Sequence, residues 1–173
     1  MNTHAIIQSQ YHASLEMLRQ VVEKCPDELW EQPVNGVALW RIAYHALFYM
    51  HLYLQPSEKD FAPWSRHRPD YEMLGVPAWN PTYVPEIGKP YAKQDLIDYV
   101  DFCHEQVDRI VPTLDWEAAS GFVWLPFGKL ELQLYSIRHL QQHIGELCER
   151  LGAHAGMAID WIGHQHGGGR LEE

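Results

Sequence analysis

Residues 129–151 read KLELQLYSIRHLQQHIGELCERL, and this stretch decides the fold class. Its apolar residues recur at spacings of three and four, which is the period of an amphipathic α-helix. Arg150 suits the last turn of such a helix, and Gly152 suits the position just after its end. The stretch therefore predicts a long helix from about Lys129 to Leu151. Its inner face would carry Leu132, Tyr135, His139, Gln142 or His143, and Glu146.

Three further segments have the same period. The first is capped by Thr3 and stopped by Pro26, and the others run from about 37 to 55 and from about 93 to 111. The segment from about 37 to 55 is apolar nearly all round, so we expect it at the centre of the molecule. The chain shows no convincing strands. Four long amphipathic helices predict an all-α fold, a four-helix bundle.

The connection between the second and third helices, residues 56–92, is long and unusual in composition. It holds seven of the eleven prolines of the chain. Its aromatic residues are Phe61, Trp64, Tyr71, Trp79, Tyr83 and Tyr91. A loop of this kind is either a lid or wall of a binding site or a crossover packed on the side of the bundle, and both interpretations stay open.

The chain divides into two parts. Residues 1–155 form one domain, the helical bundle, and residues 156–173 form a Gly- and His-rich tail. We expect this tail to be ordered only in part, with an anchor such as Trp161.

Charge and composition exclude several classes of protein. The formal net charge is −10 and the thirteen Lys and Arg residues are scattered, which argues against a nucleic-acid partner. The most apolar stretch, residues 37–54, contains Arg41, His45 and His51, so it predicts a buried helix and no membrane span. Three cysteines are too few for a disulfide framework, and the first residues do not resemble a signal peptide. We therefore expect a cytoplasmic protein.

Histidines supply the main chemical signal. His139 and His143 are four residues apart, which places both imidazoles on one helix face where one divalent ion can bridge them. With eleven histidines, chance alone supplies roughly 0.7 such pairs, so the spacing carries little weight by itself. His45 lies in the middle of the most apolar helix. A single metal would satisfy all three imidazoles, and three ligands with open positions are usual in catalytic sites. The alternative is three separate core or surface histidines, each with its own hydrogen-bond partners.

Two segments carry a resemblance to a known family. Residues 39–49, LWRIAYHALFY, and residues 136–147, SIRHLQQHIGEL, resemble the second-helix and last-helix signatures of the DinB-like (DinB/YfiT-like) superfamily. The aromatic-Pro lead-in from Gly121 to Gly128 also fits, and the match spans most of residues 1–153.

The resemblance implies a four-helix bundle with one divalent metal ion on His45, His139 and His143. It implies nickel or zinc first, with iron and manganese as alternatives, and frequent homodimers. Characterised relatives include transferases and isomerases that use low-molecular-weight thiols such as bacillithiol or mycothiol.

Several neighbours are candidates for the surroundings of this site. Glu146 follows His143 by three, and it is a fourth ligand, a general base or an acceptor for an imidazole N–H, or otherwise a surface carboxylate near Arg150. Arg41, one turn before His45, would clamp a substrate carboxylate or pair with an acidic residue of a neighbouring helix or subunit. Tyr49, one turn after His45, is a candidate for the substrate pocket.

His104 is a further candidate for the pocket, although a core histidine is the simpler interpretation. It follows Asp101 by three, which is similar to one half of a di-iron motif. Such bundles need Glu-x-x-His twice and more glutamates, and the sequence has no Glu-x-x-His.

Together these features predict a divalent-metal-dependent enzyme, either a hydrolase or a transferase that uses a low-molecular-weight thiol. Its partner would be a small-molecule substrate, with a thiol as one candidate, because nothing indicates a nucleic acid or a membrane. The alternative is a non-catalytic bundle that binds a metal or another ligand.

Overall fold

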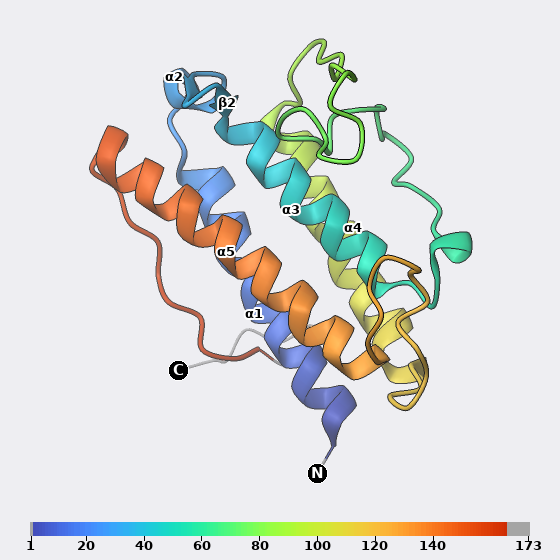
Figure 1. Cartoon of the computed structure of the whole chain (residues 1–173). Helices are drawn as coiled ribbons and strands as arrows, with labels where there is room; N and C mark the ends of the chain where they lie inside the picture. Colours follow the sequence, from blue (N-terminus) through green and yellow to red (C-terminus); the bar gives the residue numbers. More distant parts are fainter. Residues whose placement is uncertain (1, 166–173) are drawn as a thin grey trace.

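The computed structural model describes residues 2–165 and is mostly helical, which confirms the all-α class (Figure 1). The long helices are α1 (Thr3–Lys24), α3 (Leu39–Leu54), α4 (Lys93–Ile110) and α5 (Lys129–Ala155). The small elements are α2 (Asp27–Trp30), β1 (Pro33–Val34), β2 (Val37–Ala38) and the 3-10 turns η1 (Glu58–Asp60) and η2 (Val111–Thr113).

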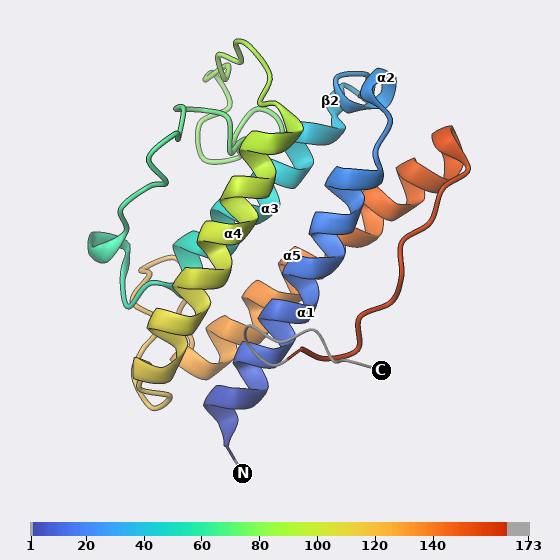
Figure 2. The same cartoon turned by 180° about the vertical axis from the view of Figure 1, so that it is seen from behind.

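The long helices form two pairs that pack on each other. In Figure 1, α3 and α5 lie side by side in front, and the reverse view in Figure 2 brings α1 and α4 to the front. Contacts join α3 to α5 and α1 to α4, and they also join α1 to α5 and α3 to α4. The helix with His45 therefore packs directly against the helix with His139 and His143.

The helix ends and one turn differ from the sequence predictions. The N-cap of α1 is Asn2, not Thr3, because the Asn2 side chain accepts a hydrogen bond from the Ala5 amide. Helix α5 continues past Gly152 to Ala155 and is capped by Gly156, whose φ of 65° is the left-handed conformation that glycine favours at a helix C-terminus. The prediction of no strands missed a two-residue hairpin, β1 with β2, whose Asn35-Gly36 turn has positive φ at both residues.

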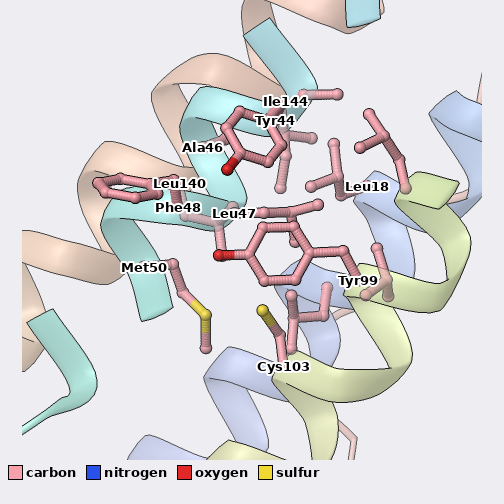
Figure 3. Packing of buried hydrophobic residues seen from close by; sticks show 14 of the residues in the cluster. Leu18, Tyr44, Ala46, Leu47, Phe48, Met50, Tyr99, Cys103, Leu140 and Ile144 are labelled. Carbon is pink, nitrogen blue, oxygen red and sulfur yellow. The ribbon is translucent and has the colours of Figure 1, made fainter. Parts of the chain in front are cut away.

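The core lies where the helix pairs meet (Figure 3). Leu18 of α1, Tyr44 and Leu47 of α3, and Tyr99 and Cys103 of α4 are all fully buried. Leu140 and Ile144 of α5 complete this part of the cluster. Helix α3 is apolar nearly all round because α4, α5 and the long connection cover different faces of it.

The connection between α3 and α4 packs partly on the helices. Trp64 stacks on Tyr99 with ring centroids 4.5 Å apart, and Tyr91 stacks on Tyr44 at 4.9 Å. Tyr71 is also buried, whereas Trp79 is 76% exposed. The two ends of the connection thus follow the packed-crossover interpretation, while its middle lies on the surface.

The described part of the tail, residues 156–165, lies beside α1. Gln20 exchanges two hydrogen bonds with the backbone of Asp160, and Gln10 donates to the Gly163 carbonyl. Trp161 is 77% exposed, so this ring does not anchor the segment, whose partly buried isoleucines pack on the core instead. Residues 166–173 of the tail lie outside the described residues. Within the described chain, no helix is both long enough and apolar enough to cross a membrane.

Candidate metal centre

The structure brings His45, His139 and His143 together across the α3–α5 interface. One ring nitrogen from each residue lies within 4.8 Å of the other two. His45 is packed against both partners, with ring centroids 5.1 Å from His139 and 4.6 Å from His143. The ridge of α3 that carries His45 meets the face of α5 on which the i, i+4 pair lies, so ordinary helix packing assembles the cluster.

The closest pair of nitrogens has the separation expected for ligands of one ion. Nε2 of His45 lies 3.2 Å from Nε2 of His139. Two nitrogens about 2.0–2.1 Å from one metal ion and 3.2 Å apart subtend an angle of about 100°, close to the tetrahedral value. The pair therefore fits a tetrahedral or octahedral divalent ion.

Two of the three rings are oriented by hydrogen bonds from their other nitrogen. Nδ1 of His45 donates to the backbone carbonyl of Glu72, so its Nε2 is left with a free lone pair. Nδ1 of His143 lies 3.2 Å from Oε2 of Glu146. Oε1 of the same carboxylate accepts from Arg150 at 2.7 Å. Hydrogen bonds of this kind fix the tautomer of a metal-binding histidine and direct its Nε2 toward the ion.

Burial holds His45 and His139 in the neutral form that binds metals. Burial, with smaller contributions from the two neighbouring imidazoles and Arg41, lowers the pKa of His45 to about 3, although the hydrogen bond to the Glu72 carbonyl acts in the opposite direction. Burial also lowers the pKa of His139 to about 4, with a smaller contribution from His143. Protons therefore compete little with a metal ion for these nitrogens at neutral pH.

Some buried polar groups at the site lack partners among the described residues. Nδ1 of His139 has none, in contrast to Nδ1 of the other two rings. Nε of Arg41 also has none, although Nη2 of Arg41 donates to the carbonyl of Met73. Three converging imidazoles, one with an orphaned ring nitrogen, form a donor set suited to a divalent transition metal.

The remaining sequence candidates divide between two places. Tyr49 lies beside the cluster, with its ring centroid 4.7 Å from that of His45 and 5.7 Å from that of His139. Arg41 reaches a backbone carbonyl of the long connection and no carboxylate in the described chain. His104 lies elsewhere, because its Nδ1 is 2.6 Å from Nδ1 of His12 on α1, and His12 in turn contacts Asp108 at 2.8 Å.

Glu72 is the residue at this site that the sequence analysis missed. Its carbonyl orients His45, and its carboxylate is half-buried, with Oε2 unpartnered among the described residues. Burial raises the pKa of this carboxyl above its usual range. It lies in the irregular connection between prolines, where no periodicity assigns a residue to a face, so the sequence held no signal for it.

Comparison of the chain with protein-family models, with curated proteins and with solved structures found no match.

Proposed function

We propose that this chain is a four-helix bundle that binds one divalent transition-metal ion, nickel or zinc first, through His45, His139 and His143. We further propose that it uses the ion in a hydrolytic or thiol-transfer reaction on a small molecule. The convergence of three ring nitrogens within 4.8 Å carries this proposal. The resemblance of residues 39–49 and 136–147 to the DinB-like superfamily supports the same three ligands and a homodimeric assembly.

The role of Glu146 favours an enzyme over a purely structural metal site. A structural site closes its coordination sphere with protein ligands, whereas a catalytic site keeps a position open. Both carboxylate oxygens of Glu146 are engaged, one by His143 and the other by Arg150. Glu146 therefore orients a ligand instead of serving as the fourth one, and positions remain for a substrate.

An ion in this site would supply Lewis acidity, which makes a nucleophile from water or a thiol at neutral pH. The surrounding residues would bind and orient the substrate. The ring of Tyr49 forms an apolar wall beside His45 and His139, and it keeps water from that side. The Arg41 guanidinium, one turn from His45, offers a positive charge for a substrate carboxylate, at the expense of its contact with Met73.

Metal analysis of tag-free protein, purified without added metal, tests the proposal. We expect one equivalent of a divalent transition metal per chain, and less than a tenth of that, roughly, in His45→Ala and His143→Ala, because two imidazoles hold such ions weakly. His104→Ala is the matched control, since it removes a half-buried histidine away from the cluster. Circular dichroism checks that each variant is folded.

Metal-free wild-type protein, or equal metal loss in His104→Ala, would overturn the proposed site. If the metal binds as expected, a screen of thiol-transfer and hydrolysis reactions decides between the two chemistries. Hydrolysis without added thiol supports the hydrolase, and activity that requires a low-molecular-weight thiol supports the transferase.

A further inference from the structure

A cavity lies against a different face of α3 from the one that carries His45. It has a volume of about 800 Å³ and opens between the C-terminal ends of α3 and α4 and the first residues of the long connection. His51 of α3 lines it and packs edge-on against Phe102 of α4, whereas His45 faces α5. The metal chemistry proposed above makes no use of this cavity.

The cavity contains a cation without an acidic partner. Arg109 lines it, and among the described residues its guanidinium forms no ion pair and donates to the side-chain oxygen of Gln106. By contrast, Arg19, Arg66 and Arg150 each pair with carboxylates. An arginine held by a neutral amide keeps its charge and most of its donors free for an anionic group.

Two buried polar side chains add further donors. The oxygen of Gln106 is taken by Arg109, so the side-chain NH₂ of Gln106 is the group left for a ligand. Nδ1 of His51 lies 3.2 Å from the hydroxyl of Tyr99, which has no other acceptor in the described chain and therefore donates to it. The proton of His51 is then on Nε2, which makes this neutral ring another donor.

Apolar groups line much of the remaining wall. Phe102 and Ile110 come from α4, and Pro56 and Pro63 come from the connection. A cavity with one guanidinium group, neutral hydrogen-bond donors and apolar walls suits a ligand with an anionic end and an apolar body. Asp60 is the one carboxylate of the lining, and its Oδ2 accepts a hydrogen bond from Ser57 at 2.6 Å.

We propose that this cavity is a binding site for a small organic carboxylate. Its carboxylate accepts hydrogen bonds from Arg109 and Gln106, and its apolar body lies against Phe102 and Ile110. This site is separate from the proposed metal centre, and a ligand there does not depend on a metal ion. The carboxylate of Asp60 repels the carboxylate of the ligand, so it lowers the affinity of the cavity for this ligand.

Titration with benzoate tests this site, with benzamide as the neutral probe of the same shape. Calorimetry gives the affinity, and amide chemical-shift changes in nuclear magnetic resonance locate the probe. We expect benzoate to shift the signals of Phe102, Gln106 and Arg109 and to bind about tenfold more tightly than benzamide, because a hydrogen bond to a charged group is lost with benzamide. Asp60→Asn should tighten benzoate binding.

Arg109→Gln should weaken benzoate binding about tenfold or more. Arg138→Gln is the matched control, because this exposed arginine lies over the Tyr135 ring on α5 and should leave the affinity unchanged. His143→Ala should also leave it unchanged, because the cavity does not contain His143. Thermal unfolding checks the fold of each variant.

Equal binding of benzoate and benzamide, or equal affinity in wild type and Arg109→Gln, would show that Arg109 does not recognise a carboxylate. If binding is lost in His143→Ala and kept in Arg109→Gln, benzoate binds at the metal centre. That result would overturn the carboxylate site while leaving the proposed metal function in place. Failure of metal binding, in turn, would leave this test unaffected.

Discussion

At the scale of single residues, the candidate metal centre depends on the orientation of each imidazole ring. A histidine binds a metal well when its other nitrogen donates to a fixed acceptor. His45 uses a backbone carbonyl for this purpose, and His143 uses the carboxylate of Glu146. The contact with Glu146 is the one that a substitution can test, because a side chain can be replaced without changing the backbone.

Glu146→Gln should weaken metal binding about 10–100-fold while leaving the three ligands in place. The substitution keeps the shape of the side chain and removes the negative charge that contacts Nδ1 of His143 and pairs with Arg150. Competition with a chromophoric chelator gives the affinity. The control is Glu149→Gln, an exposed carboxylate on the same helix. Equal affinities in the two variants would mean that Glu146 does not support the ligand.

At the scale of elements, Lys129 joins the start of α5 to the end of α3. It is 3% exposed, and its ammonium donates to the backbone carbonyls of Gln55, Pro56 and Ser120. These carbonyls lie at the C-terminal end of α3 and in the loop before α5, where helical hydrogen bonds are missing. Lys129 thus helps to fix, at one end, the register of α3 against α5 on which the histidine cluster depends.

Lys129→Met should lower the free energy of unfolding by about 1–3 kcal/mol, because it leaves buried carbonyls without their donor. Methionine keeps the length and flexibility of the side chain, so the loss is mainly polar. Urea denaturation followed by circular dichroism measures the change. Lys59→Met, at an exposed lysine of η1, should change the stability by less than about 0.5 kcal/mol. A similar small effect at Lys129 would show that the carbonyls find water instead.

How far the elements follow from the sequence depends on periodicity. The four long helices were predictable to within a few residues, because their buried faces repeat every three to four residues. The hairpin carried the Asn35-Gly36 signal of a tight turn but was missed, since strands of two residues have no alternation to detect. The position of Glu72 could not be predicted for a different reason. Its loop has no periodicity, so tertiary packing alone determines where the residue lies.

At the scale of the whole molecule, buried neutral histidines make stability depend on pH. Burial, helped by the charge of Arg109, lowers the pKa of His51 to about 4. Burial beside His12 lowers that of His104 to about 4 as well. Between about pH 6.5 and pH 4 the unfolded chain therefore binds more protons at these positions than the folded chain does. The free energy of unfolding must rise with pH through this window, so this stabilisation is complete above it and is lost as the pH falls to about 4.

The slope of the free energy of unfolding against pH isolates the contribution of one histidine to this pH dependence. In metal-free protein, His51→Gln should reduce the slope between pH 6 and pH 4.5 by up to about 1.4 kcal/mol per pH unit, whatever it does to the absolute stability. Urea denaturation at several pH values gives the slopes. His154→Gln removes an exposed histidine of α5 and should leave the slope as it is in the wild type. An unchanged slope in His51→Gln would mean that His51 takes up its proton in the folded protein as readily as in the unfolded chain. The cavity beside Arg109 would then gain a second cation when His51 is protonated, and it should bind benzoate more tightly as the pH falls through the pKa of His51.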